Sequence, residues 1–396
     1  MNILFLGPFC PKEKIDDILK VSHHFSFSAN ILEQALIEGF DNYGNVMVVS
    51  SLKMVTKRFI VPGFTFKHIT TSAYKDVVLS YVNIPLYDRI VNGYRKYKEV
   101  IKQGFTPDII FIYSIRTDDI CAAMLLKKEF PKAVVVNMIT DLAQYMRDNP
   151  SWLYRIIKKT ETDLSDKLRK KYVDAFVLLS PFMKEHLPIG SKPCTILEGI
   201  YQPESIELDL LEKKKEKIIF YSGNLDARYG ILDLVDAFKT IDNPSYRLYL
   251  CGNGNTVNTI VNTALSDNRI KYLGVLPRKD VLVLQRQATL LVNPRHSNEE
   301  YTKFSFPSKT MEYMASGTPT LMSELQSLPD DYKQHVFLFD DESVVGMRKK
   351  IQEVLEIPAG ELKRIGAGAR EFILSQKTSD IQCKRIIDFV NNNNFN

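Results

Sequence analysis

Short apolar runs alternate with amphipathic stretches along most of this chain. Two of the runs begin in the same way, because residues 2–7 and 217–223 are each a β-rich segment that ends in glycine. Each predicts a buried parallel strand that leads into a loop and then into a helix. Further strands are expected at 46–49, 109–113, 134–137, 176–179, 247–250, 270–273, 290–293, 320–322 and 336–338.

Helical patterns fall between the expected strands. Ile231, Leu234 and Phe238, for example, recur at helical spacing after the strand that ends at Gly223. Strands that alternate with helices predict parallel βαβ units and doubly wound sheets. The pattern occurs twice, and a chain of 396 residues is long for a single core. We therefore expect an α/β fold of two Rossmann-like domains that face a central cleft. Their expected bounds are 1–202 and 203–375, with a last helix at about 376–396 packed back on the first domain.

Composition narrows the class of protein without naming a function. With 45% hydrophobic and 25% charged residues, the chain is typical of a folded soluble protein. The five cysteines are dispersed and form no Cys/His cluster, which argues against a disulfide framework and a structural zinc site. Neither a secretory signal nor a long apolar run stands out, so a cytoplasmic location is expected.

The positive charge is concentrated in the first half of the chain. Residues 1–200 hold 27 Lys/Arg against 21 Asp/Glu, whereas the remainder has a net charge of −1. Much of the excess lies in 147–172, beside the single tryptophan, Trp152. Basic residues with interfacial aromatics predict contact with an anionic membrane surface, on its inner face, rather than with nucleic acid. An ordinary amphipathic helix is the alternative. Residues 77–97 mix apolar and basic residues and are expected to line a site for a lipid-linked acceptor.

The segment 304–319, which reads FSFPSKTMEYMASGTP, carries the most specific chemistry. Ser308 follows a proline and is expected to be the N-cap of a helix that ends at Gly317. The start of a helix offers free N–H groups to a phosphate, here around Ser308–Thr310. Lys309 opposes the helix dipole unless an anion lies nearby. Glu312 is placed to accept hydrogen bonds from paired sugar hydroxyls, although spacing alone leaves a capping or surface carboxylate equally open.

This segment resembles the signature of retaining GT-B glycosyltransferases, especially glycosyltransferase family four, in a subgroup associated with bacterial surface polysaccharide assembly. In that family two glutamates stand eight positions apart before an Ala-Met-Ala-Ser-Gly-like run. Glu312 matches the second glutamate, and 313–319 match the run. Phe304 replaces the first glutamate, which in the family helps to hold the donor sugar or its phosphate. This departure weakens a direct transfer of the two-glutamate mechanism.

The resemblance covers most of 217–375 and, more loosely, the first domain. Gly223 and Asn224 begin a loop that in the family supplies a basic pair for the donor diphosphate. Asn224 and Tyr229 replace the usual cations, and Arg228 remains. The glycine turn and the loop that contacts the base add Gly252, Asn253, Gly254 and Leu276 to the expected donor-binding residues. Because no third glycine follows, a nicotinamide dehydrogenase is disfavoured.

In the first domain, the candidate residues stand at the ends of strands and helices. Gly7 follows the first strand and is expected to bring its backbone N–H near the donor. Ser28 and Asn30 lie near the start of the next helix and are assigned to the acceptor. Asp141 follows the strand at 134–137 and is a candidate for acceptor contact or for accepting its proton, with a helix N-cap as the alternative.

The resemblance implies transfer of a sugar from a UDP- or GDP-sugar to a hydroxyl of a glycan or lipid-linked acceptor, with retention at the anomeric carbon. Arg228 and Lys309 would stabilise the leaving diphosphate, while Glu312 positions the ribose. Neither a cofactor nor a metal ion is expected, because cationic side chains take that role. Two alternatives stay open: a GT-B nucleotide-sugar epimerase, and a non-catalytic nucleotide-sugar-binding partner of another transferase.

Overall fold

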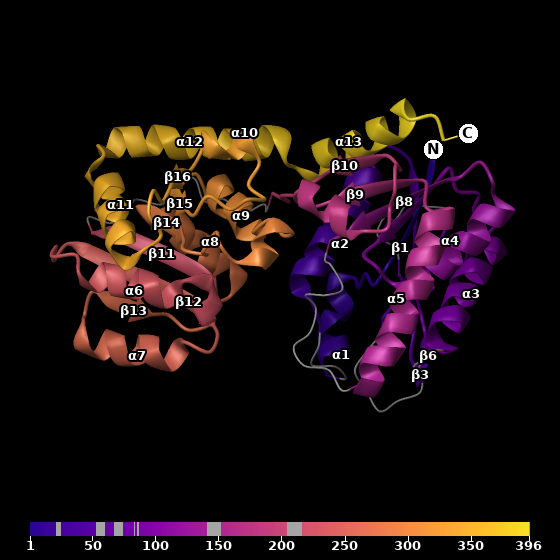
Figure 1. Ribbon diagram of the computed structural model, residues 1–396, viewed down its shortest axis with the longest axis horizontal. Coiled ribbons are helices and arrows are strands. Elements are labelled where there is room, and N and C mark those ends of the chain that lie inside the picture. The colour runs from indigo at the N-terminus through magenta and orange to yellow at the C-terminus, as the bar shows by residue number, and fades with distance from the viewer. Residues whose placement is uncertain are drawn as a thin grey trace. The chain divides into compact units, whose positions relative to one another are not determined.

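The computed structural model describes residues 1–20, 25–52, 60–66, 74–82, 84, 87–140, 152–203 and 216–395. The chain forms two compact units: unit 1 comprises Met1–Ile200 with Ser379–Asn396, and unit 2 is Tyr201–Thr378 (Figure 1). Asp141 lies outside the described residues, as do residues 147–151 of the basic aromatic segment.

Unit 1 is built on a sheet of eight strands in the order β10-β9-β8-β7-β1-β2-β5-β4. Every neighbouring pair is parallel except β4 with β5, which is antiparallel. The central strands are buried along nearly their whole length, as expected when helices cover both faces of a sheet. The strands of unit 1, including the separate pair β3 and β6, are β1 (Asn2–Gly7), β2 (Asn45–Ser51), β3 (Ile60–Val61), β4 (Phe64–Phe66), β5 (Asp76–Leu79), β6 (Tyr81–Val82), β7 (Ile109–Tyr113), β8 (Val134–Ile139), β9 (Ala175–Leu178) and β10 (Cys194–Ile196).

The helices of unit 1 lie against this sheet (Figure 1). They are α1 (Ile15–Leu19), α2 (Phe27–Phe40), α3 (Tyr87–Lys102), α4 (Thr117–Glu129), α5 (Trp152–Tyr172) and α13 (Ser379–Asn392), with short 3-10 turns at Lys12–Lys14 and Pro181–His186. The last helix, α13, packs on α2, where Cys383 and Ile387 are buried in the same apolar cluster as Leu36 and Phe40. Unit 1 is therefore assembled from both ends of the chain.

Unit 2 is a six-stranded, fully parallel sheet in the order β13-β12-β11-β14-β15-β16. Its strands are β11 (Lys217–Asn224), β12 (Tyr246–Asn253), β13 (Ile270–Tyr272), β14 (Leu290–Asn293), β15 (Thr320–Met322) and β16 (Phe337–Leu338). Its helices are α6 (Ile231–Lys239), α7 (Val257–Ser266), α8 (Arg278–Gln287), α9 (Ser308–Ser316), α10 (Asp330–Lys333), α11 (Val344–Glu356) and α12 (Ala359–Gln376), with 3-10 turns at Ala227–Tyr229 and Glu300–Lys303. Helices flank both faces of the sheet (Figure 1).

The α/β fold expected from the alternating pattern is confirmed. The strands at 2–7, 109–113, 290–293 and 320–322 begin and end where predicted, and the others differ by a few residues. Five short strands were not predicted: β3, β4, β5, β6 and β10. Their few residues show no full period of alternation, and β5 was assigned to the apolar and basic segment that also contains α3. Edge strands of this length depend on pairing with a neighbour, which a single segment does not reveal.

Candidate functional site

The start of α9 is the centre of the candidate site in unit 2. The helix begins at Ser308 with Pro307 as its N-cap, and no side chain caps it. The prediction that Ser308 is the N-cap was therefore wrong by one residue, because the proline turn itself sets the entry of the chain into the helix. Ser308 is exposed, and the Thr310 N–H already donates to the Pro307 carbonyl at 2.8 Å. The predicted end at Gly317 is confirmed, since this residue is the C-cap with a φ of 78°.

Tyr313 fixes α9 to the end of the central strand β11. Its hydroxyl accepts a hydrogen bond from the Ser222 N–H at 2.9 Å and donates one to the Ser222 carbonyl at 3.1 Å. The next residue, Gly223, lies directly under the Lys309 side chain: a Cβ at Gly223 would stand 2.8 Å from Lys309 Cε. A side chain at Gly223 would have to displace Lys309, so the structure brings together Gly223 and Lys309, two residues that the sequence analysis selected separately.

Glu312 faces helix α8 one turn into α9. It accepts hydrogen bonds from Arg278 Nη1 at 2.8 Å and from Gln285 Nε2 at 2.6 Å. Burial acts to raise the pKa of this carboxyl, but the charges of Lys309 and Arg278 and the two hydrogen bonds bring it below its usual value. Glu312 is therefore an ionised, largely buried carboxylate, with 14% of its side chain exposed. It is neither a cap nor a surface group.

Arg278 and Gln285 were missed by the sequence analysis. They stand seven positions apart on α8 and thus on one face of that helix. The signal was available, since Arg278 directly follows the Leu276-Pro277 loop that the sequence analysis assigned to the base. Nothing in the sequence paired that helix face with Glu312, however, because Gln285 and Arg278 are 27 and 34 residues away from it and meet it only in the folded unit.

The loop after β11 places Arg228 at the surface. Its side chain is 63% exposed, and its Nε donates to Asp226 Oδ1 at 3.1 Å. This hydrogen bond is the main reason that the pKa of Asp226 is lowered. Asn224 is the last, exposed residue of β11. The predicted cation of this loop is thus already paired with a carboxylate.

The glycine turn at the end of β12 is a close contact between two strands. Gly252 has a φ of 138°, and a Cβ there would lie 1.7 Å from the Gly223 carbonyl oxygen. Asn253 is exposed and caps the turn by accepting the Gly254 N–H at 2.9 Å. Leu276 is half-buried against the apolar cluster beneath. The residues assigned to the donor from Gly252 to Leu276 therefore lie at the carboxyl edge of the sheet, where doubly wound folds bind ligands.

Phe304 occupies the position of the missing glutamate as a buried side chain. It ends the 3-10 turn that precedes α9, and its N–H donates to the Tyr301 carbonyl at 3.1 Å. With 5% of its surface exposed, it contributes packing rather than charge.

The candidates of unit 1 have mixed placements. A Cβ at Gly7 would lie 2.4 Å from Glu33 Oε1, a buried carboxyl whose pKa burial raises well above its usual value. The Asn30 amide is engaged with the backbone of Cys10, accepting its N–H at 2.8 Å and donating to its carbonyl at 2.9 Å. Ser28 is exposed in the first turn of α2, where Ser26 is the cap. Thr140 is buried just before Asp141, which the structure does not describe.

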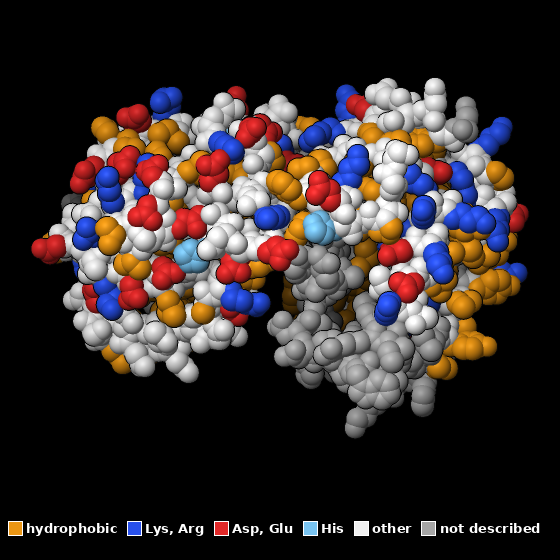
Figure 2. Space-filling model, in the orientation of Figure 1, with side chains coloured by type: hydrophobic (Ala, Val, Ile, Leu, Met, Phe, Trp, Pro, Cys, Tyr) orange, Lys and Arg blue, Asp and Glu red, His pale blue; other side chains and the backbone are white. Residues whose placement is uncertain are grey.

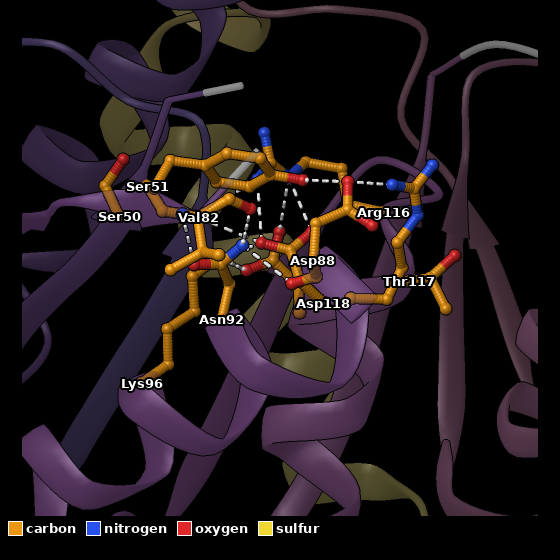
Figure 3. A network of polar contacts seen from close by, with 12 residues as sticks. Ser50, Ser51, Val82, Asp88, Asn92, Lys96, Arg116, Thr117 and Asp118 are labelled. Atoms are coloured by element: carbon orange, nitrogen blue, oxygen red, sulfur yellow. Dashed lines mark hydrogen bonds and ion pairs between the residues drawn. The ribbon is translucent and has the colours of Figure 1, made fainter. Parts of the chain in front are cut away.

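A buried network of charges near the carboxyl ends of β2 and β7 was also missed (Figure 3). Lys96 of α3 is fully buried between two aspartates, with Nζ 2.8 Å from Asp118 Oδ2 and in contact with Asp119. Arg116 also binds Asp118, at 2.7 Å. Burial would raise the pKa of Asp118, but Arg116 and Lys96 hold it well below its usual range. Ser51 donates to the same carboxylate at 3.0 Å, so the network joins β2, α3 and α4.

Two negative findings apply to the described part of the chain. No group of three or more His, Cys, Asp or Glu residues there is arranged to hold a metal ion. No described helix is long and apolar enough to cross a membrane.

Comparison with known proteins places this site in a recognised domain. Residues 204–372 match the family model described as Glycosyl transferases group 1. The comparison with curated proteins gave no match.

Solved structures resemble the whole chain. A sucrose-phosphate synthase from Thermosynechococcus elongatus is similar with a TM-score of 0.62 at 14% identity, covering 99% of this chain and 98% of that one. The lipopolysaccharide outer core galactosyltransferase WaaB has a TM-score of 0.65 at 16% identity, with 98% and 99% covered. The Anabaena protein HepE in complex with UDP also has a TM-score of 0.65, at 13% identity, with 99% and 100% covered. The chain therefore has the GT-B fold with two Rossmann-like domains, and the glycosyl transferases group 1 domain in its second unit supports a glycosyltransferase.

Proposed function

We propose that this protein is a retaining glycosyltransferase that moves a sugar from a nucleotide-sugar to a hydroxyl of a glycan or lipid-linked acceptor. The observation that carries the proposal is the start of α9, where Lys309 crosses Gly223 and the ionised Glu312 follows one turn later. A cation and a buried carboxylate at the carboxyl edge of a parallel sheet suit the two halves of a nucleotide. The cation faces the phosphates, and the carboxylate accepts bonds from the ribose hydroxyls.

UDP- or GDP-sugars are the proposed donors. HepE has been solved with UDP and with UDP-glucose, and an E. coli structure of similar fold, described as trehalose-6-phosphate, has been solved with UDP-2-fluoro glucose. In this chain, Glu312 is bridged to Arg278 at 2.8 Å. Binding of a ribose at Glu312 therefore requires Arg278 to give up or share this carboxylate. In this proposal Arg278, with 47% of its side chain exposed, turns away from Glu312 when the ribose binds.

The proposed chemistry is loss of a nucleoside diphosphate and attack by the acceptor on the same face of the sugar. Negative charge grows on the leaving phosphate as the glycosidic bond breaks. The Lys309 side chain and the backbone N–H groups of Ser308 and Lys309 stabilise that charge, with Arg228 as a second cation once it separates from Asp226. The departing phosphate accepts the acceptor proton, and Asp141 is the candidate for assisting that transfer. The buried Phe304 fills the position where the family has a carboxylate. The proposed mechanism therefore uses no protein nucleophile at this position.

A helix face of unit 1 supports a membrane-bound acceptor. Tyr87, Ile90 and Tyr94 share one face of α3, and their side chains are 70%, 62% and 49% exposed. Figure 2 shows hydrophobic side chains gathered over α3 at the right-hand edge of the view. Lys98 extends the same face, with Nζ 5.7 Å from the centre of the Tyr94 ring. We propose that this face contacts anionic lipid on the cytoplasmic side of a membrane, where surface polysaccharides are assembled on lipid carriers.

Vesicle co-sedimentation tests the membrane contact. The protein is mixed with vesicles of phosphatidylcholine, with and without phosphatidylglycerol, at low salt. Binding to the anionic vesicles is expected, and a variant with I90S and Y94S should lose most of it. Leu265, an apolar residue of unit 2 with 84% exposure, provides the matched control as L265S. Equal binding by all three proteins would contradict the proposed surface.

Product analysis tests the transfer itself. The protein is incubated with UDP- and GDP-sugars, with and without a lipid-linked or glycan acceptor, and the products are identified by mass spectrometry and NMR. Consumption that depends on the acceptor, with an unchanged anomeric configuration in the product, is the expected result. Conversion of the sugar without an acceptor would identify an epimerase. Tight binding without turnover would identify a non-catalytic partner, and inversion would refute the retaining mechanism.

A further inference from the structure

Arg295 is a cation at the carboxyl edge of the sheet of unit 2 that the donor site described above does not use. It stands two residues after the end of β14 (Leu290–Asn293), and β14 lies between β11 and β15 in the sheet. The preceding residue, Pro294, contacts the loop that follows β11, because a Cβ at Gly230 would lie 2.1 Å from the Pro294 carbonyl oxygen. Arg295 therefore belongs to the same edge as Gly223 and Lys309.

Two tyrosines hold the guanidinium of Arg295 in place. Its Cζ lies 5.3 Å from the centre of the Tyr229 ring and 4.4 Å from that of Tyr301. The in-plane N–H groups make long hydrogen bonds, from Nε to the Tyr301 hydroxyl at 3.3 Å and from Nη2 to Ser305 Oγ at 3.4 Å. Both acceptors are neutral, and a guanidinium has more N–H donors than these two bonds employ. The side chain is thus pre-positioned while donors remain for a ligand.

The charge of Arg295 has no counterion within the described chain. Arg228 is bonded to Asp226 and Arg278 to Glu312, but no carboxylate is recorded against Arg295 in the ranges that the structure describes. Lys309 makes no ion pair or hydrogen bond within those ranges, although its charge acts on Glu312 one turn further along α9. A half-buried cation without a carboxylate is most stable when an anion binds it.

Tyr221 lies beside both of these cations. Its hydroxyl and Lys309 Cε would stand 2.7 Å and 2.8 Å from a Cβ at Gly223, so both side chains reach this glycine. Burial is the main cause that raises the pKa of Tyr221, and among the nearby charges Arg295 acts to lower it. The carboxyl edge of unit 2 therefore carries Lys309 and Arg295, neither of them in an ion pair within the described residues, near the glycine at the end of β11.

We propose that Arg295 binds the diphosphate of the nucleotide-sugar opposite Lys309, and that Tyr229 and Tyr301 act as positioning residues for its guanidinium. A planar guanidinium that presents an N–H edge suits two phosphate oxygens. The inference rests on the proposed donor and adds a phosphate ligand to it.

Calorimetric titration of the full chain with UDP, UMP and uridine, and with the guanosine series in parallel, tests the inference. R295A should weaken binding of the diphosphate by about 10- to 100-fold, as expected for the loss of a charge-assisted contact. It should leave nucleoside binding within about twofold, since the base and ribose contacts remain. R295K keeps the charge but loses the planar stack, so its affinity should fall between the two. Arg269, which lies over Phe238 at 5.1 Å and precedes β13 at the opposite edge, provides the control R269A.

The outcomes separate the inference from the proposed function. If the unaltered protein binds a nucleoside diphosphate and R295A binds it equally well, the inference is wrong and the proposed donor stands. If R295A weakens nucleoside and diphosphate binding to the same extent, the effect is structural and the inference is again overturned. If the unaltered protein binds neither diphosphate, the donor and the inference fail together. A selective loss for the diphosphate in R295A, absent in R269A, supports the proposal.

Discussion

Replacement of Glu312 by alanine tests whether the carboxylate between α8 and α9 holds unit 2 together. Gln285 is fully buried and donates to Glu312 Oε1 at 2.6 Å, and to Ser222 Oγ at 3.2 Å. Removal of the carboxylate leaves one buried N–H group without its acceptor, which costs about 1–3 kcal/mol. The ion pair with Arg278 adds at most about 1 kcal/mol, because nearly half of that arginine side chain is exposed to solvent. We expect E312A to lower the free energy of unfolding of unit 2 by about 2–3 kcal/mol.

Scanning calorimetry measures this loss, and hydrogen exchange of β11 and α9 assigns the transition to unit 2. A domain of this size loses about 2–4 °C in Tm per kcal/mol, so a decrease of roughly 4–12 °C is expected. E312Q keeps an acceptor for Gln285 and should lose less than half as much. E371A, at an exposed position on α12, should change the free energy of unfolding by less than about 0.5 kcal/mol. If E312A melts within about 1 °C of E371A, the hydrogen bonds to Gln285 and Arg278 do not stabilise the unit.

The remaining predictions concern charge. K309A should lower turnover by about 10²-fold in a steady-state transfer assay, because it removes a donor that faces the leaving phosphate. The control K279A, at an exposed position of α8, should keep the turnover of the unaltered protein. Equal turnover in K309A and K279A would refute the role of Lys309. The lowered pKa of Glu312 means that its ionised form stabilises the folded state above the unperturbed value of 4.5, and that this contribution disappears as the pH falls through the lower folded value. The difference in stability between the unaltered protein and E312Q should accordingly be constant near pH 7 and shrink below about pH 4.5 in urea titrations; a difference that does not depend on pH would contradict the assignment. K96M should destabilise unit 1 by about 3–5 kcal/mol, because it removes the fully buried cation that Asp118 and Asp119 share and leaves both carboxylates to Arg116 alone. K98M, on the exposed face of the same helix, should have little effect on urea unfolding, and similar midpoints for the two variants would refute the buried network as a source of stability.

The positions of most strands could be predicted from the sequence, because buried parallel strands appear in it as continuous apolar runs. β7, β14 and β15 were predicted residue for residue, since each is a short run of apolar residues with polar residues or a turn on either side. β4 and β5 were not, because β5 contains a buried aspartate, Asp76, whose carboxylate accepts the Val48 N–H at 2.8 Å. Because Asp76 is polar, the sequence pattern did not indicate a strand there. β5 forms because it pairs with the neighbouring strand β2.

The candidate site was partly visible for the same reason. Lys309 and Glu312 lie on one helix, so their spacing is a local property that the sequence displays. Arg278, Gln285 and Arg295 come from other elements, and their roles depend on which helix and which strand end the fold sets beside α9. The predicted N-cap at Ser308 was wrong by one residue because caps depend on backbone geometry that differs little between adjacent positions.

The sequence by itself determined the two parallel α/β units and the residues of the α9 segment, because periodicity and glycine positions follow from backbone sterics within a few residues. The tertiary structure alone decided the electrostatics. It paired Glu312 with Arg278, which is 34 residues away, and it left Arg295 without a carboxylate in the described chain. Charge pairing depends on distances between segments far apart in sequence, and such distances exist only once the sheet orders its strands.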